Sequence, residues 1–315
     1  MGIHIKPAAR PEGDRIAEIQ STAVPQLPPW VAASTHIPFR RATAHFDGAG
    51  GMDILTFQQR VFEAYQSVLA ELEAGFPTHL ARFWAFIPGI HEDLGAGLDR
   101  YMAFNAGRYA AFASHYGRPA AFDRSIPTAS AVGVQGEQFV LHGLAAAVRG
   151  VPVENPRQVS AYHYSRRFGP MPPCFARATL LHAPTAEPLL IVGGTASITG
   201  EESRHLGDLT AQARETFHNL ASVVASAAGL KLHEYASPTD IAPLLGAFTD
   251  IRVYHRQEAD RAKIAALLAT VFPASCAVEI IHASLCRSEL LIEIEGLALP
   301  GRVIGRASPG LASQH

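Results

Sequence analysis

Reactive side chains gather near the C-terminal end of the sequence, where a thiol and two carboxyl groups lie within ten residues. Cys286 precedes Glu293 by seven positions, and Glu295 follows two positions later. A carboxyl group flanked by isoleucines, as Glu293 is, can donate a proton at neutral pH when burial raises its pKa. Glu295 is the competing candidate for that role. A solvent-exposed polar sheet face is the alternative interpretation of the whole group.

The surrounding pattern predicts a β-hairpin that carries these groups on one face. Residues 278–285 and 290–299 are apolar, partly alternating runs, and the polar residues 286–289 separate them. Pairing residue 285 with residue 290 places His282 opposite Glu293, on the same face as Glu295. On a flat ladder Cys286 lies about 13 Å from Glu293, at roughly 3.3 Å per residue. A shared pocket therefore requires a longer loop or a strong twist.

A second group, at residues 161–178, has the side chains that bind carboxylates. Tyr162, Tyr164 and Arg177 occur within sixteen positions. An arginine can bind a carboxylate through two parallel hydrogen bonds, and phenol hydroxyls can add further ones. Arg177 lies within the apolar run F-A-R-A-T-L-L, where an unpaired charge would be costly, so a ligand-binding role is favoured.

Two further motifs could contact a ligand. The run G-G-T-A-S, which contains Thr195 and Ala196, lacks the glycine spacing of nucleotide-binding loops. Its adjacent glycines are expected to let a flat substrate approach the main chain closely. Arg108 lies on a predicted helix one turn after Asn105, and it is as consistent with a surface residue as with a binding residue.

Composition excludes several classes of partner. The 26 basic and 28 acidic residues are nearly balanced and form no long basic run, so neither nucleic acid nor an anionic membrane is an expected partner. No apolar segment approaches the ~18 residues of a membrane span, and a cytoplasmic location is expected. The three cysteines and fifteen histidines show no metal-ligand spacing, so no metal and no cofactor is predicted.

The elements predicted along the chain form an α+β fold with one repeated unit. Strand and helix patterns give β-α-β-α-β-β over residues 37–150, and residues 151–315 repeat this order. We expect an irregular lead-in at 1–36, an N-terminal domain at 37–150 and a C-terminal catalytic domain at 151–315. Each unit should have a sheet with helices on one face.

Seven motifs, in this order, resemble the chorismatase family. They are R-F-W-A-F-I-P-G-I at 82–90, F-N-A-G-R at 104–108, S-A-V-G at 130–133, N-P-R-Q-V-S-A-Y-H-Y-S at 155–165, F-A-R-A at 175–178, G-T-A-S-I-T-G-E-E-S at 194–203 and E-I-E-G at 293–296. The C-terminal strands are also similar to the reactive-intermediate deaminase (Rid) superfamily of trimer-forming proteins. A monomer or a homotrimer of tandem Rid-like, chorismate-mutase-like units is the expectation.

The resemblance implies cleavage of chorismate, a dianion, with release of pyruvate. It assigns Glu293 as the acid, Arg177 and Arg108 as carboxylate-binding residues, and Tyr162 and Tyr164 as hydroxyls of the cleft. Protonation of the enol ether methylene by Glu293 would give an oxocarbenium ion.

Two markers disagree about the ring product. Cys286 occupies the place of a cysteine found in family members that form 3-hydroxybenzoate, alone or with 4-hydroxybenzoate. Ala196 is the residue found in members that hydrolyse chorismate to a dihydroxycyclohexadienoate. We give Cys286 more weight, since a thiol can take part in chemistry. A Rid-like imine hydrolase or ligand-binding protein, which would need only one arginine, is the alternative from another class.

Overall fold

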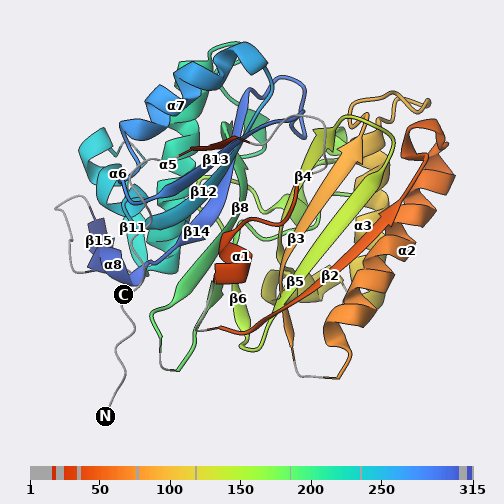
Figure 1. Ribbon diagram of the computed structural model, residues 1–315, viewed down its shortest axis with the longest axis horizontal. Coiled ribbons are helices and arrows are strands. Elements are labelled where there is room, and N and C mark those ends of the chain that lie inside the picture. The colour runs from red at the N-terminus through yellow and green to blue at the C-terminus, as the bar shows by residue number, and fades with distance from the viewer. Residues whose placement is uncertain are drawn as a thin grey trace.

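The chain folds into two sheets with helices on their outer faces. The computed structural model describes residues 16–18, 25–33, 37–75, 78–117, 119–184, 186–234, 236–304 and 311–313. Figure 1 shows α2 and α3 outside one sheet and α5, α6 and α7 outside the other, with the two sheets between these layers.

The first unit contains four strands and two long helices. Its elements are β2 (Phe39–Phe46), α2 (Ile54–Glu73), β3 (His79–Pro88), α3 (Arg100–Tyr116), the short α4 (Phe122–Ser125), β4 (Thr128–Val134) and β5 (Phe139–Ala146). The strand order is β2-β5-β3-β4, in which β3 and β4 run parallel while β5 runs antiparallel to both of its neighbours.

The second unit repeats this topology. Its elements are β8 (Leu189–Ala196), α5 (Leu209–Ala227), β12 (Phe248–His255), α7 (Arg261–Ala269), β13 (Ala277–His282) and β14 (Ile292–Ala298). The order β8-β14-β12-β13, with β12 and β13 parallel, matches the first unit strand for strand. The predicted α+β duplication is therefore confirmed.

Shorter elements extend or connect the two units. The second sheet continues through β7 (Ala178–Leu181) and β6 (Gly150–Val153) on one side and β1 (Ile16–Glu18) on the other. The connecting elements are α1 (Trp30–Ala33), β9 (Ile198–Thr199), β10 (Glu202–Ser203), β11 (Leu230–Leu232), α6 (Pro238–Leu245), α8 (Gly301–Ile304) and β15 (Leu311–Ser313). No helix in the described ranges has the length and apolar character that crossing a bilayer requires.

The long helices begin where the sequence provides caps. The carboxylate of Asp53 accepts a hydrogen bond from the Thr56 amide at the start of α2, and Asp208 accepts one from Ala211 at the start of α5. Such a cap satisfies an amide that has no partner within the helix, and it stabilises a helix by roughly 1 kcal/mol.

Three apolar clusters hold the layers together. One lies between the first sheet and α2 and α3, and a second lies between the second sheet and its helices. The third lies between the two sheets, where Trp84 and Val132 of the first meet Ile191 and Tyr254 of the second. Trp30 of α1 packs against Trp84, with ring centroids 6.0 Å apart, so part of the N-terminal segment belongs to this inner core.

The predicted C-terminal hairpin is wrong, although both of its strands exist. β12 lies between β13 and β14, so His282 is opposite His255, and Glu293 is opposite Tyr254. Period-two alternation identifies a strand but not its partner, and the partner here lies far away in the sequence. The intervening segment instead reaches the first sheet, where Ser284 forms a bridge with Gly133.

Residues 159–164 alternate in polarity, which is typical of a strand, but they do not form one. This segment contains a short 3-10 turn, Ala161–His163, and it is tied to the second unit by a hydrogen bond from the Val159 amide to the Gly200 carbonyl. Its alternating side chains therefore belong to a loop and not to a strand. The sequence pattern alone could not distinguish these two cases.

Candidate active site

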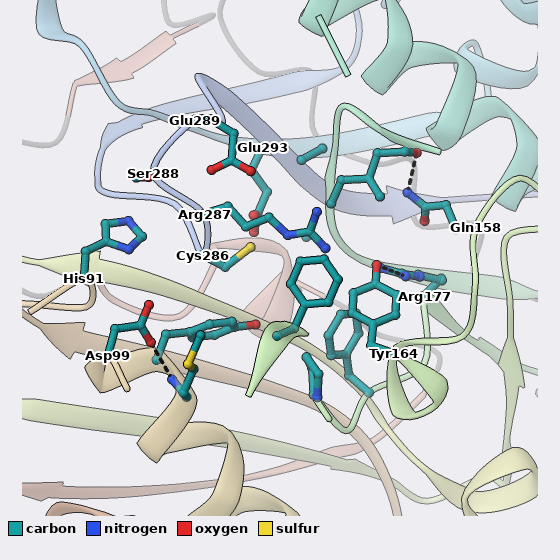
Figure 2. A pocket seen from close by; sticks show the side chains of 18 residues that line it. His91, Asp99, Gln158, Tyr164, Arg177, Cys286, Arg287, Ser288, Glu289 and Glu293 are labelled. Atoms are coloured by element: carbon teal, nitrogen blue, oxygen red, sulfur yellow. Dashed lines mark hydrogen bonds between the residues drawn. The ribbon is translucent and has the colours of Figure 1, made fainter. Parts of the chain in front are cut away.

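A cavity of about 230 Å³ lies where the two units meet (Figure 2). Its walls come from the start of α3, the loop between β6 and β7, β8, β14 and the segment before β14. The lining residues are His91, Asp99, Tyr101, Met102, Gln158, Tyr164, Phe168, Pro173, Phe175, Arg177, Gly194, Ala196, Ile198, Cys286, Arg287, Ser288, Glu289 and Glu293. Five residues singled out from the sequence are among them: Glu293, Cys286, Arg177, Tyr164 and Ala196.

Glu293 is held in the cavity wall by its strand. In β14 it pairs with Ala196 of β8 on one side and Tyr254 of β12 on the other, and its side chain is almost fully buried. Its carboxyl group lies directly over the main chain of Gly194, where the Cβ of any other residue would overlap Oε1. The glycine pair was expected to let a substrate approach the main chain closely. At Gly194 it is instead the Glu293 carboxyl group that does so.

The surroundings of Glu293 favour its protonated form. Burial raises the pKa of Glu293 to about 8, and the negative charge of Glu295 adds to the rise. The positive charges of Arg82 and Arg177 offset part of it. At neutral pH this group is a carboxylic acid that faces a cavity, which is the state a proton donor needs.

Glu295, two residues along the same strand, has a different environment. Its carboxylate accepts hydrogen bonds from Arg82 Nη2 at 2.6 Å, Ser130 Oγ at 2.6 Å, Trp84 Nε1 at 2.8 Å and Tyr254 OH at 3.3 Å. It is 2% exposed and does not line the cavity. Because donors occupy both of its oxygens, its geometry fits a structural anion better than a proton donor.

Arg177 is a buried cation at the cavity wall. Its Nη2 donates hydrogen bonds to the Val159 carbonyl at 2.9 Å and to the Tyr164 hydroxyl at 2.8 Å (Figure 2). The ring of Phe175 lies beside it, 5.1 Å from ring centroid to guanidinium carbon. Within the described residues no carboxylate forms an ion pair with Arg177, so this charge is available to an anionic ligand.

A second arginine, which the sequence interpretation did not single out, also lines the cavity. The guanidinium carbon of Arg287 lies 4.1 Å from the ring centroid of Phe168 and 5.5 Å from that of Tyr164. Its Nη1 donates hydrogen bonds to the Glu201 carbonyl at 2.9 Å and to Ser203 Oγ at 3.0 Å. Figure 2 shows its guanidinium group close to Tyr164 and on the same side of the cavity as Glu293. The cavity therefore presents two positive charges.

Arg108 does not reach the cavity lining. It lies on α3 at 1% exposure, and its Nη2 donates a hydrogen bond to Asn105 Oδ1 at 2.7 Å. Its guanidinium group is flanked by Phe104 at 4.8 Å and by Phe175 at 5.5 Å. Since Phe175 lines the cavity, Arg108 lies behind that ring.

Tyr162 and Thr195 also lie outside the lining. The Tyr162 ring packs against Phe122, with centroids 6.4 Å apart. Thr195 pairs with Ile294, whose side chain lies in the core between sheet and helices, so it faces away from Glu293. Its hydroxyl donates a hydrogen bond to the Gly193 carbonyl at 2.9 Å.

Cys286 shares the cavity with Glu293, as Figure 2 shows, because the segment between β13 and β14 is an excursion and not a tight turn. Burial raises the pKa of the Cys286 thiol to about 12, and the charge of Glu293 adds to the rise. The thiol is therefore protonated at neutral pH. The 13 Å separation expected from a flat hairpin does not apply, since that hairpin does not form.

Several lining residues were missed from the sequence. Nothing in the sequence spacing of these residues marks them as neighbours in space; they are His91, Asp99, Tyr101, Gln158 and Glu289. The available signals were that His91 directly follows the motif at 82–90 and that Gln158 lies inside the motif at 155–165. Among the residues described, no group of three His, Cys, Asp or Glu side chains could hold a metal ion.

Comparisons with known proteins agree on one family. Residues 36–145 match the family model described as "Chorismatase FkbO/Hyg5-like, N-terminal". A 3-hydroxybenzoate synthase from Streptomyces hygroscopicus is 35% identical over 240 residues, which cover 75% of this chain and 68% of that protein. A chorismatase from Streptomyces rapamycinicus is 33% identical over 225 residues, which cover 71% of this chain and 64% of that protein. A crystal structure of a chorismatase superposes with a TM-score of 0.69 at 28% identity, covering 84% of this chain and 75% of that one.

The contact between Glu293 and Gly194 gives a direct test of the geometry. In Gly194→Ala the added methyl group would displace the Glu293 carboxyl from its buried position, so its pKa should fall toward the ordinary value of 4.5. We expect a decrease of at least about one pH unit, equivalent to ~1.4 kcal/mol. Carboxyl carbon NMR of the labelled glutamate, recorded across a pH titration, measures this shift.

Gly51→Ala is the matched control, since nothing lies within 4 Å of a Cβ at that position. It should leave the titration of Glu293 unchanged. An unchanged pKa in a folded Gly194→Ala protein would contradict the described packing of the carboxyl group.

Proposed function

This chain belongs to the chorismatase family, and from that membership and the chemistry of the cavity we propose that it converts chorismate to pyruvate and 3-hydroxybenzoate, alone or with 4-hydroxybenzoate. The observation that carries the proposal is the buried Glu293 with its raised pKa, facing a cavity that also holds two arginines. Chorismate has an acid-sensitive enol ether and two carboxylates, so each of these features has a counterpart in the substrate.

The first step of the proposed reaction is proton donation by Glu293. The carboxylic acid protonates the terminal methylene carbon of the enolpyruvyl group, which makes the attached carbon an oxocarbenium centre. The resulting Glu293 carboxylate remains close to this positive charge, in a site where burial strengthens their attraction. The bond between the ether oxygen and the ring carbon then breaks, and this oxygen becomes the ketone oxygen of pyruvate. For 3-hydroxybenzoate the neighbouring ring hydroxyl bonds to the vacated carbon and leaves its own, and loss of a ring proton completes the aromatic ring.

Arg177 and Arg287 are proposed to bind the two carboxylates of the substrate. Each is a guanidinium group on the cavity lining, packed against aromatic rings that limit its contact with water. A charge-assisted hydrogen bond gains strength in such surroundings. Arg108, which the family resemblance had assigned to this task, lies behind Phe175 and is proposed to support that ring.

Cys286 is proposed to favour the aromatic product. Once Glu293 has donated its proton, its carboxylate is a base within the same cavity, and it recovers the proton that the ring loses. The transfer is either direct or through Cys286, whose thiol gives its proton to the carboxylate and takes up the ring proton. Pyruvate and hydroxybenzoate together contain all the atoms of chorismate, so this branch needs no oxidant and no net water. The relative named 3-hydroxybenzoate synthase supports this choice of product.

Hydrolysis to a dihydroxycyclohexadienoate is the second candidate, and Ala196 is the observation that favours it. Ala196 lines the cavity opposite Glu293, at the position where the resemblance associates alanine with hydrolysis. This branch consumes one water. A Rid-like imine hydrolase is less favoured, because a substrate with one carboxylate gives no role to the second arginine of the cavity.

One incubation tests the proposal. Purified protein is mixed with chorismate, and the products are separated by chromatography against standards of both hydroxybenzoates and the dihydroxycyclohexadienoate. Pyruvate together with 3-hydroxybenzoate supports the proposal, pyruvate with the dihydroxy product supports the second candidate, and unchanged chorismate contradicts both.

Replacing the acid should stop the reaction without unfolding the protein. Because an amide has no acidic proton, Glu293→Gln is expected to lower kcat by at least about 100-fold, at the lower end of typical general-acid contributions. In the parent protein, activity should decline as pH rises above about 8, where Glu293 loses its proton. A coupled assay for pyruvate measures both effects.

The control is Glu202→Gln, which removes an exposed carboxylate from the outer ion pair with Arg167. It should retain the parent rate. Normal turnover by Glu293→Gln would remove this residue from the proposed mechanism.

Loss of either proposed carboxylate-binding arginine should weaken substrate binding. In the inactive Glu293→Gln background, Arg177→Gln and Arg287→Gln are each expected to cost about 1.5–3 kcal/mol of binding free energy, or roughly 10- to 150-fold in Kd. Isothermal titration calorimetry with chorismate measures the difference. Arg167→Gln is the control, because Arg167 is an exposed arginine in the loop between β6 and β7 that also contains Arg177. Unchanged affinity in Arg287→Gln would show that Arg287 is a packing residue.

Removal of the thiol should change the product more than the rate. Protonation by Glu293 precedes any role of Cys286, so Cys286→Ala is expected to release pyruvate within about tenfold of the parent rate, a change of ~1.4 kcal/mol. The ratio of hydroxybenzoate to dihydroxycyclohexadienoate should fall, because alanine leaves water as the available nucleophile. Chromatography of the products gives the ratio directly. An unchanged ratio would show that the thiol only fills apolar space and that the surroundings of Ala196 determine the product.

A further inference from the structure

A second buried carboxyl group faces Arg177 from outside the cavity. At the end of the β6–β7 ladder Val153 pairs with Ala178, so the next rung of the same antiparallel register places Glu154 opposite Arg177. Residues on one rung project to the same side of a sheet. The Arg177 guanidinium lines the cavity, whereas Glu154 is not part of the lining.

The Glu154 carboxyl and the Arg177 guanidinium are buried near each other without a hydrogen bond or ion pair between the two side chains. Both carboxyl oxygens of Glu154 are buried and make no well-formed hydrogen bond, although the Ser160 hydroxyl and the Arg177 main-chain amide lower its pKa as nearby donors. Arg177 Nε is also buried without a hydrogen-bond partner. No ion pair within 4.0 Å joins the two residues in the described part of the chain. They still interact through their charges, because a buried environment screens them weakly.

The groups around Glu154 come from three neighbouring segments. They are Arg177 beside β7, Ser160 and Tyr162 in the loop after β6, and Asp123 on α4. Burial raises the pKa of Glu154 to about 7, the charge of Arg177 and the hydroxyl of Ser160 offset part of the rise, and Asp123 adds to it. Near neutral pH the group is therefore divided between its acid and its carboxylate.

We propose that Glu154 is a positioning residue that couples the binding of chorismate at Arg177 to the uptake of a proton. In the free protein the Glu154 carboxylate is the internal counter-charge of Arg177. A substrate carboxylate that binds the guanidinium brings a second negative charge into the same buried region. Two such charges cannot both be accommodated at low cost, so Glu154 takes up a proton and the substrate becomes the counter-ion. This inference rests on the proposed function.

The sign of the effect follows from linkage. If binding raises the pKa of Glu154, binding must consume protons, and affinity must fall as pH rises through the pKa of the free protein, near 7. A group at its pKa is half protonated, so uptake near neutral pH is limited to roughly half a proton per site. Chorismate would then bind more weakly in alkaline solution, independently of the ionisation of the catalytic acid.

Glu293 is the other carboxyl group of this site with a pKa in the same range, and the experiment has to remove its contribution. Burial raises the pKa values of Cys286 and Tyr162 to about 12 and lowers that of His91 from 6.5, so these groups change little in slightly alkaline solution. Glu293→Gln removes the titration of Glu293 and also stops turnover, which allows binding of chorismate itself to be measured.

The test compares Glu293→Gln with Glu293→Gln/Glu154→Gln by isothermal titration calorimetry with chorismate. Titrations near pH 7 in two buffers of different ionisation enthalpy give the number of protons taken up. We expect up to about half a proton for the single variant and none for the double variant. Between about pH 6.5 and 8.5, Kd should rise by roughly sixfold or more in the single variant and stay within about twofold in the double variant.

Glu63→Gln in the same background is the matched control, because that carboxylate is exposed on α2, where it accepts hydrogen bonds from Gln59 and Arg60 of the same helix. It should leave the proton uptake unchanged. Equal uptake and equal pH dependence with and without Glu154 overturn the inference. Failure of chorismate to bind Glu293→Gln at any pH overturns the proposed function and this inference together, whereas binding without proton uptake overturns only the inference.

A second measurement does not depend on how Glu154→Gln folds. Carboxyl carbon NMR of labelled Glu293→Gln protein follows the titration of Glu154 with and without chorismate. We expect its pKa to rise by at least about one unit in the complex, which corresponds to a tenfold linkage with affinity. A Glu154 pKa that does not change on binding overturns the proposal.

Discussion

The buried ion pair between Arg82 and Glu295 is the interaction on which the rest of the site depends. It joins β3 of the first sheet to β14 of the second, and its two side chains are 1% and 3% exposed. Removing one partner of such a pair leaves an uncompensated buried charge, at a cost of about 3–5 kcal/mol. The pair therefore fixes how the two sheets face each other. Ser130 extends this link, since its Oγ donates a hydrogen bond to Glu295 and accepts one from the Gly194 amide.

The same pair determines which carboxyl group of β14 keeps a proton. Glu293 and Glu295 lie on one face of the strand, two residues apart, and two carboxylates so close in a buried layer disfavour each other's charge. Glu295 accepts hydrogen bonds from four donors and forms the ion pair with Arg82. Glu293 lies over Gly194, and burial together with the charge of Glu295 raises its pKa, so it stays protonated near neutral pH. Two identical side chains on one strand therefore have different environments.

Much of this arrangement could be predicted from local sequence signals, and the failures share one cause. Asp53 marks the start of α2 because capping depends on the next few residues, and the duplicated unit follows from the order of strands and helices. Contacts between distant segments leave no such signal. The partner of β14 is β12, which no alternation within residues 278–299 can reveal. Likewise, no local pattern shows that Arg108 packs against Phe175 and stays outside the cavity lining, while Arg287 belongs to it.

The duplication also explains why the described residues form such a site in one unit and not in both. Gly143 of β5 and Gly296 of β14 are equivalent positions, because both face the helix-covered side of their sheets. When the two strands are aligned on these glycines, Val140 and His142 of β5 take the places of the two carboxyl residues of β14. The first unit instead contributes the cation, Arg82, that faces those carboxyl groups. Carboxyl groups on both inner faces would bring like charges together between the sheets without a counter-ion. The division of charge between the two units therefore permits them to pack, and it leaves a single protonated carboxyl group at the cavity.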